Sequence, residues 1–238
     1  MISFKIMRGS RLGNHMFWYA SLKGIASAHG YDYCFPKHGH QLFDIFDLKC
    51  KIGYINKLYI TSESLLKYCP DNVSITGYLH SDKYFSHIKK EIKNDFKFKN
   101  IKKSDFIDTN EKLISMHVRR GDYLKTDKFI KLNFDYYEKA LSIIDNHNNN
   151  KISVLVFSDD YEWCKKNFTN KRFIIMNNSK EIDMYLMTKC KWHIIANSTF
   201  SWWGAYLSDS ELVIAPKNYY KDEIKNNNYS IPATWLKI

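Results

Sequence analysis

The sequence has few of the residues that cross-link small secreted domains or bind structural zinc. Five cysteines occur in 238 residues, and no two of them have the C-x-x-C spacing. An odd number of scattered cysteines in a chain of this length predicts neither a disulfide framework nor a zinc site, and a reducing compartment fits better. The cysteines are Cys34, Cys50, Cys69, Cys164 and Cys190.

Long apolar runs are missing as well. A membrane-spanning helix needs about 18 consecutive apolar residues, and no such run occurs in the sequence. The opening segment, MISFKIMRGS, contains one short apolar stretch that Lys5 interrupts, and it is too short for a signal-peptide core. We therefore expect a cytoplasmic protein.

Positive charge is in excess, with 36 Lys and Arg against 25 Asp and Glu and a formal net charge of +11. Such a field attracts nucleic acid, nucleotides and anionic membranes alike. Nucleic-acid binding usually brings arginine and a recognisable module, and the sequence shows neither around its lysine run at 89–103. That run predicts either a solvated face or a weak contact with a membrane surface.

The second half of the chain alternates short apolar segments with amphipathic ones. Strands are expected at about 112–118, 152–158, 172–176, 192–197 and 211–216, and helices at 133–147, 161–168, 179–190 and 198–208. This order predicts an α/β protein with a parallel, doubly wound sheet. Ligands bind beyond the carboxyl ends of such strands, so the loops of interest are 119–123, 158–161, 177–180 and 197–201.

The first half is less regular. A strand at 2–7, a helix from Asn14 that ends at Gly30, and a strand at 31–36 predict another β-α-β unit. Between 37 and 112 the pattern predicts only some helices and irregular loops. We expect two domains, residues 1–110 and 111–238.

Two arginines follow the expected strand at 112–118, in the segment HVRRGDY. Arginine stays charged and pairs with phosphate through two hydrogen bonds. Arg119 and Arg120 therefore form either an anion site or a surface ion pair with Asp122. Gly121 would let the backbone approach a ligand closely.

Three other loops offer further candidate ligands. RGSRLGNH (8–15) places two glycines before a helix, which predicts either an anion site at the helix N-terminus or a plain tight turn. FSDDY (157–161) has two carboxylates that would cap a helix, bind a metal or contact the edge of a base. NSTFSWWGAYL (197–207) brings hydroxyl groups to a strand-to-helix turn, where they can face a phosphate while the tryptophans pack in the core.

Together these segments resemble the α-1,2-fucosyltransferase family, within the wider group of GDP-fucose-dependent fucosyltransferases. HVRRGDY, FSDD and NSTFSWWGAYL resemble its three motifs in order. LGNHMFWYA (12–20) resembles an N-terminal motif, and DMYLMTKC resembles the segment before the third motif. The resemblance implies a GT-B fold, with two Rossmann-like halves and a cleft between them. The acceptor would belong mainly to the N-terminal half and the donor to the C-terminal half.

The resemblance also implies an activity. It is the inverting, metal-independent transfer of L-fucose from GDP-β-L-fucose to a glycan hydroxyl, typically O2 of a β-galactoside. The chain has no D-x-D triplet, the usual divalent-metal signature of nucleotide-sugar enzymes. The alternatives are a related GDP-sugar transferase with another acceptor and an inactive nucleotide- or glycan-binding module.

The implied diphosphate site consists of basic and hydroxyl side chains in the C-terminal half. Arg119 would bind the β-phosphate, and Arg120 would complete or brace the site. The hydroxyl groups that would hold phosphate oxygens belong to Ser198, Thr199 and Ser201.

The other implied donor contacts fall on the base and on the N-terminal half. His117 would meet guanine or orient its loop. One carboxylate of Asp159 and Asp160, with Asp160 preferred, would contact guanine. The turn that approaches the donor from the N-terminal half contains Arg11, Gly13 and Asn14.

The group that would accept the proton of the acceptor hydroxyl stays open. Asp122 and His15 are the candidates, and a mechanism with little base assistance is the third option. His15 stands where the family usually has Gln, and Arg11 replaces a glycine. The expected partners are GDP-fucose and a glycan acceptor, with no metal, no other cofactor and no nucleic acid. A peripheral membrane contact through the lysine run is a further expectation.

Overall fold

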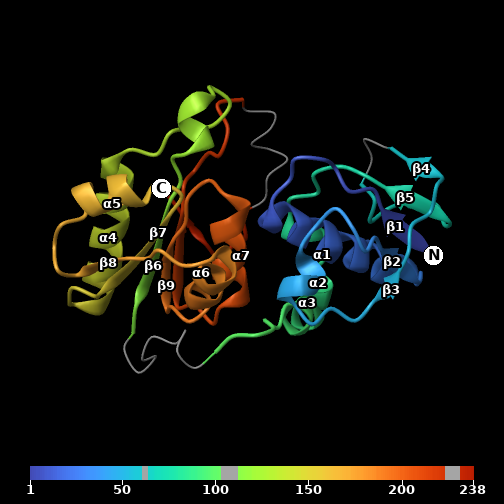
Figure 1. The fold of residues 1–238 in the computed structure, drawn as a ribbon, viewed down its shortest axis with the longest axis horizontal. Helices are drawn as coiled ribbons and strands as arrows, with labels where there is room; N and C mark the ends of the chain where they lie inside the picture. The colour runs from blue at the N-terminus through green and yellow to red at the C-terminus, as the bar shows by residue number, and fades with distance from the viewer. Residues whose placement is uncertain (61–63, 103–111, 223–230) are drawn as a thin grey trace. The chain divides into compact units, whose positions relative to one another are not determined.

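The computed structural model describes residues 1–60, 64–102, 112–222 and 231–238 (Figure 1). The chain divides into two compact units, Met1–Asn100 and Ile101–Ile238, called below the N-terminal and C-terminal units. The boundary predicted between positions 110 and 111 lies outside the described residues. Each unit contains a parallel sheet, so the predicted α/β class with two Rossmann-like halves is confirmed.

The N-terminal sheet has the strand order β3-β2-β1-β5-β4. β1 (Ile2–Phe4) lies in the middle and pairs in parallel with β2 (Tyr33–Phe35) and β5 (Val73–Ile75). Between β1 and β2 the chain forms α1 (Leu12–His29), which begins at Leu12 and not at Asn14 as predicted. Gly30 ends the helix as predicted, with a φ of 66° that favours glycine.

The segment from 37 to 102 contains more strand than its pattern predicts. Two short strands, β3 (Lys51–Ile52) and β4 (Leu58–Tyr59), form opposite edges of the sheet. Strands of two or three residues are too short to show a periodicity, which is why β3, β4 and β5 escape prediction. The helical elements here are α2 (Leu42–Ile45), η1 (Asp82–Tyr84), η2 (Ser86–Ile88) and α3 (Lys89–Asp95).

The C-terminal sheet has six parallel strands in the order β11-β10-β9-β6-β7-β8. They are β6 (Ile114–Val118), β7 (Val154–Ser158), β8 (Phe173–Ile175), β9 (Trp192–Ile194), β10 (Leu212–Ala215) and β11 (Leu236–Lys237). The connecting helices are α4 (Phe134–Asn148), α5 (Tyr161–Asn167), α6 (Lys180–Met187) and α7 (Thr199–Leu207). The predicted alternation is confirmed through β10, and β11 adds an edge strand that no pattern indicates.

Helices cover both faces of this sheet (Figure 1). On one face, buried apolar side chains from alternate strand positions, including Met116 and Val156, pack against α4 and α5. On the other face, His117 of β6 meets Ser201 of α7. There α6 and α7 approach closely at Gly204, where a Cβ atom would lie only 2.8 Å from the Met187 side chain.

Side-chain caps fix where helices begin at the carboxyl edge of this sheet. Asp160, Ser179 and Ser198 each accept a hydrogen bond from a backbone N–H two or three residues ahead. The cap predicted at Ser179 is confirmed, and so is the capping role considered for Asp160. Because the strands are parallel, these polar residues gather at one edge of the sheet.

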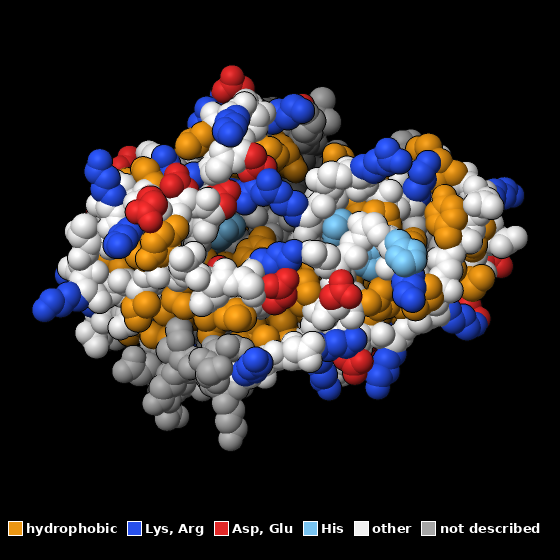
Figure 2. Space-filling view, in the orientation of Figure 1, with side chains coloured by type: hydrophobic (Ala, Val, Ile, Leu, Met, Phe, Trp, Pro, Cys, Tyr) orange, Lys and Arg blue, Asp and Glu red, His pale blue; other side chains and the backbone are white. Residues whose placement is uncertain are grey.

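The positive charge is spread over the surface. In Figure 2, Lys and Arg side chains are dispersed over the face in view, with acidic side chains between them. Lys89, Lys90 and Lys97 of the lysine run are exposed, as a solvated face requires, whereas Lys103 lies outside the described residues. No helix in the described ranges is long and apolar enough to cross a bilayer. All five cysteines are free.

Candidate functional site

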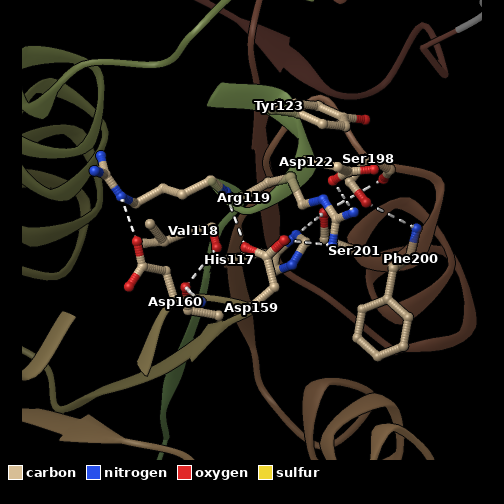
Figure 3. A network of polar contacts seen from close by, with 12 residues as sticks. His117, Val118, Arg119, Asp122, Tyr123, Asp159, Asp160, Ser198, Phe200 and Ser201 are labelled. Atoms are coloured by element: carbon tan, nitrogen blue, oxygen red, sulfur yellow. Dashed lines mark hydrogen bonds and ion pairs between the residues drawn. The ribbon is translucent and has the colours of Figure 1, made fainter. Parts of the chain in front are cut away.

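Arg119 lies just beyond the carboxyl end of β6 and is held by two carboxylates (Figure 3). Its Nη1 lies 2.7 Å from Oδ2 of Asp159, and its Nη2 donates to Oδ1 of Asp122. Its guanidinium carbon lies 5.2 Å from the ring centre of Tyr123. The ion pair with Asp122 therefore exists, but it is no ordinary surface pair, because only 13% of the Arg119 side chain is exposed.

Arg120 makes a separate set of contacts. Its Nε lies 3.0 Å from Oδ2 of Asp160, and its guanidinium carbon lies 3.9 Å from the ring centre of Trp163. Its backbone N–H donates to Oδ1 of Asp159 at 2.9 Å. Asp159 thus connects the backbone of one arginine to the side chain of the other. Of the two roles predicted for Arg120, bracing is the one that these contacts fit.

Two small residues bring the ends of β6 and β7 together. A Cβ atom on Gly121 would lie 2.5 Å from Oδ2 of Asp159, so a larger residue would displace the carboxylate that holds Arg119. Ser158 donates to the backbone oxygen of Val118 at 2.8 Å and accepts from the backbone N–H of Asp160 at 2.9 Å. Gly121 permits a close approach, and the approaching group here is the Asp159 carboxylate.

His117 connects β6 to the start of α7. Its Nδ1 lies 2.9 Å from Oγ of Ser201, and its ring centre lies 5.8 Å from that of Phe200 (Figure 3). Burial, with a smaller contribution from the charge of Arg119, lowers the pKa of His117 to about 3. The imidazole is therefore neutral at physiological pH and presents one donor and one acceptor nitrogen.

The hydroxyl-bearing turn after β9 lies beside this histidine. Ser198 and Ser201 are buried, and Thr199, the first residue of α7, is half-buried. Oγ of Ser198 accepts from the backbone N–H of Phe200 at 3.3 Å. The turn thus presents hydroxyl groups and a helix N-terminus at the same edge of the sheet as Arg119.

Tyr123 ties the arginine turn to the turn after β9. Its hydroxyl donates to the backbone oxygen of Asn197 at 2.9 Å, and its ring stacks on Phe129 with the ring centres 4.0 Å apart. Asn197 in turn donates from Nδ2 to the backbone oxygens of Ile130 and Tyr219. These contacts fix the position of Arg119 relative to the hydroxyl turn.

Asp183 of α6 is a further candidate, which is not among the residues predicted from the sequence. Burial raises the pKa of Asp183 to about 6, although Nδ2 of Asn178 donates to its Oδ1 at 3.1 Å, which lowers it. A carboxyl group with such a pKa, next to one of the loops at the carboxyl edge, is typical of a functional site. The signal in the sequence is DMYLMTKC, the segment before the third motif.

The predicted N-terminal contributors lie together at the start of α1, in the other unit. Arg11 is the N-cap residue and makes no side-chain capping bond, Gly13 is buried, and Asn14 is half-buried. His15 is also buried, with its ring centre 5.3 Å from that of Trp18 and 5.9 Å from that of His40. Most of the C-terminal candidates lie together within their own unit, as Figure 3 shows.

The donor set of the C-terminal group suits an anion better than a cation. Three or more His, Cys, Asp or Glu side chains do not gather in a metal-binding arrangement anywhere in the described ranges. The carboxylates of Asp122, Asp159 and Asp160 each face an arginine. A diphosphate could replace such a carboxylate on the guanidinium of Arg119, because both anions accept paired hydrogen bonds.

The chain has relatives among characterised proteins. It is 35% identical over 185 residues to an α-1,2-colitosyltransferase of Escherichia coli, an alignment that covers 70% of this chain and 63% of that protein. It is 40% identical over 128 residues to the O-antigen biosynthesis glycosyltransferase WbnK of Escherichia coli, an alignment that covers 49% of this chain and 42% of that protein. A galactoside 2-α-L-fucosyltransferase, Sec1 of Mus musculus, is 28% identical over 242 residues, an alignment that covers 88% of this chain and 66% of that protein. The aligned chain thus spans less than two thirds of either Escherichia coli relative.

Two solved structures with a similar fold are glycosyltransferases. The fucosyltransferase NodZ from Bradyrhizobium has a TM-score of 0.58 at 12% identity, with 87% of this chain and 93% of that chain covered. A family 9 glycosyl transferase from Veillonella parvula has a TM-score of 0.55 at 8% identity, with 100% of this chain and 86% of that chain covered. The likeness confirms the predicted GT-B type of fold. A family model described as glycosyl transferase family 11 matches residues 66–238, well over half of the sequence and every motif of the C-terminal unit, and the chain therefore belongs to glycosyl transferase family 11.

Proposed function

We propose that this protein transfers L-fucose from GDP-β-L-fucose to a glycan hydroxyl, O2 of a β-galactoside in the simplest case. Arg119 is the main support, since it is a largely buried arginine between two carboxylates at the carboxyl edge of a parallel sheet. Family membership and the names of the relatives, which include α-1,2-colitosyl and galactoside 2-α-L-fucosyl transfer, support the reaction class.

In the proposed complex the diphosphate binds where Asp122 now contacts Arg119. Asp122 is the more exposed of the two carboxylate partners, at 49% against 24% for Asp159, so it is the easier one to displace. The hydroxyl turn of Ser198, Thr199 and Ser201 receives the remaining phosphate oxygens, with the N-terminus of α7 behind it.

Guanine lies beside His117 and the Asp159–Asp160 turn in this proposal. All four oxygens of the two carboxylates already accept from Arg119, Arg120 or Trp163. A carboxylate oxygen has room for a second donor, so a ring N–H of guanine can add to Asp160 without breaking these contacts. Neutral His117 offers a further hydrogen bond to the base.

The chemistry follows from where charge develops. As the bond from C1 of fucose to GDP breaks, negative charge accumulates on the β-phosphate, and a fixed guanidinium there stabilises the transition state without a metal. The acceptor hydroxyl attacks C1 from the opposite side, which inverts the configuration. Asp122, once released from Arg119, is the proposed general base, because its exposure suits contact with an incoming hydroxyl better than the buried ring of His15.

A second donor merits the same assay. Colitose differs from fucose only in lacking the 3-hydroxyl group, and an Escherichia coli relative is an α-1,2-colitosyltransferase. A site that hydrogen-bonds the 3-hydroxyl would reject the colitosyl donor strongly, whereas a site that encloses that position with apolar groups would not.

Calorimetry with GDP, GDP-fucose and UDP in EDTA tests the donor site, and a glycan screen with GDP-fucose and GDP-colitose tests transfer. We expect GDP and its sugar to bind without metal and UDP to bind weakly. Preference for UDP, or failure to bind any nucleotide, would refute the proposal. Binding of GDP-fucose without transfer to any glycan would point to the binding-module alternative.

A further inference from the structure

The N-terminal sheet has one face covered by α1 and a second face covered by an extended segment. Phe4 and Phe35 face α1, with ring centres 5.2 Å from Trp18 and 5.5 Å from Tyr19, respectively. The alternate residues Ser3, Cys34 and Ser74 therefore face the other side of the sheet, and all three are buried. What buries them is residues 53–57, called here the strap.

The strap crosses the strands from one edge of the sheet to the other. Ile55 N–H donates to Oγ of Ser3 at 3.0 Å, Ser3 donates to Ser74, and Oγ of Ser74 donates back to the oxygen of Ile55 at 2.5 Å. A Cβ atom on Gly53 would lie 3.3 Å from Sγ of Cys34. The six residue-to-residue steps from Ile52 to Leu58 span about 20 Å when extended, which matches the roughly 19 Å of four strand spacings from β3 to β4.

Gly53 and the backbone of Ile55 contact the sheet, and large side chains between and beside them are exposed. Tyr54 is 46% exposed, Leu58 37% and Ile60 73%, although large apolar side chains are usually buried. Lys51 and Lys57 are exposed among them. Lys51 pairs with Asp32 at 2.7 Å, whereas Lys57 makes no ion pair within the described part of the chain. Positions 48–60 contain three lysines and no acidic residue. We call Lys51, Tyr54, Lys57, Leu58 and Ile60 the strap surface. Figure 2 shows hydrophobic side chains beside Lys and Arg over the part of this unit where Figure 1 labels β3, β4 and β5.

We propose that the strap surface docks this protein on an anionic lipid bilayer. Exposed aliphatic side chains enter the boundary of the acyl region, tyrosine prefers the headgroup level, and lysines pair with anionic headgroups. The composition argues against a protein partner, because protein interfaces are enriched in arginine and depleted in lysine. The family match begins at residue 66, so this surface lies outside the part of the chain that the family model describes.

Co-sedimentation with vesicles tests the proposal. Vesicles of phosphatidylcholine alone are compared with vesicles of phosphatidylcholine and phosphatidylglycerol in equal parts, without nucleotide, so that failure here leaves the proposed transfer reaction untouched. We expect binding to the anionic vesicles only. Ile60→Ser should weaken it about tenfold or more, since the side chain no longer enters the bilayer. Lys57→Ser should weaken it about fivefold.

The matched control is the pair Lys89→Ser and Lys90→Ser on α3, which removes exposed lysines of the predicted lysine run. It should leave vesicle binding within about twofold, and thermal unfolding should show that every variant is folded. Loss of binding in the α3 variant alone would overturn the proposal in favour of the lysine run. A lack of binding by the wild type, or a dimer in solution that Ile60→Ser dissociates, would overturn it as well.

Discussion

The two units begin with the same local pattern, a buried strand followed by a turn, and they differ in what the turn presents. After β6 the chain places Arg119 and Arg120 against three carboxylates, two of which come from the end of β7. After β1 it places Arg11 before a helix whose first turn has no acidic residue. The C-terminal unit therefore holds its cationic group in a preorganised position through neighbouring acids.

This difference assigns the two units different tasks in the proposed reaction. A transferase without a metal needs a fixed positive charge at the leaving group, and buried ion pairs fix an arginine better than solvent does. At the start of α1 the N-terminal unit has instead buried aromatic and histidine side chains that pack against one another.

The largest effect is expected for Arg119→Ala. Losing a donor aimed at developing charge commonly lowers kcat about 100- to 1000-fold, and the neighbouring Arg120 is engaged by Asp160 and Trp163 instead. Steady-state transfer with saturating donor measures the effect. Near-normal turnover would end the assignment of Arg119 as the phosphate-binding group.

The matched control is Arg172→Ala, in the same unit. Arg172 is equally buried and makes two ion-pair contacts of 2.7 Å with Asp145, but it precedes β8 and so lies at the opposite edge of the sheet. This variant should lower the free energy of unfolding and keep the kcat of the folded fraction. Equal losses of kcat in both variants would mean that the Arg119 effect is structural.

Acid should destabilise both units through buried neutral histidines. Burial lowers the pKa of His80 and His117 to about 3 and that of His193 to about 4. The unfolded chain binds these protons near pH 6.5, so their contribution to stability is fully present above that pH and is lost progressively as the pH falls from 6.5 to the folded values. At pH 5 each histidine should reduce the free energy of unfolding by about 2 kcal/mol relative to pH 8.

Denaturant titrations between pH 8 and pH 5 measure this loss. Asp183 has the opposite effect on stability. Because its pKa is raised, it stabilises the folded state below about pH 3.8, and this stabilisation is lost as the pH rises through about 6. Asp183→Asn should therefore steepen the fall in stability over this range. A stability that is flat from pH 8 to pH 5 would contradict the burial of the three neutral histidines.

Gly121→Ala should lower kcat about tenfold with little change in stability. The added methyl group would displace Oδ2 of Asp159 and release Arg119 on one side. Asp159→Asn should lower kcat by a similar factor. The double variant should lose no more kcat than the more impaired single variant, because both changes break the same contact. Additive effects would show that Gly121 acts in another way.

The smallest effect is expected for Tyr123→Phe. It removes the hydrogen bond to Asn197 and keeps the ring beside Arg119 and Phe129, so kcat should fall about threefold to tenfold, the size of one ordinary hydrogen bond. The kcat of Tyr123→Ala should fall further, since this variant lacks the ring as well. If both variants keep full activity, Arg119 does not depend on this brace.

Much of the C-terminal unit is predictable because its strands and helices are long enough to show a period. α4 and α6 have clear apolar faces, and Ser179 and Asp160 stand where caps belong. β11 is not predictable, because a strand of two residues depends entirely on pairing with β10. The same holds for β3 and β4 in the N-terminal unit.

The roles within HVRRGDY are only partly predictable. Arg119 and Arg120 are adjacent and chemically identical, so the sequence offers no physical basis for separating them. The separation comes from the register of β6 against β7, which sets Val118 opposite Ser158 and so brings Arg119 and Arg120 to Asp159 and Asp160. Asp183 escapes notice for a related reason, since its raised pKa depends on burial among residues that are distant in sequence.

The sequence by itself determines the alternation of strands and helices, the polar loops at the carboxyl edge and the family to which the motifs belong. These features are local, because periodicity, caps and short motifs act over a few residues. Only the tertiary structure decides which carboxylate holds which arginine, that His117 is neutral, and that a strap covers the second face of the N-terminal sheet. These features depend on strand register and burial, which join residues far apart in the chain.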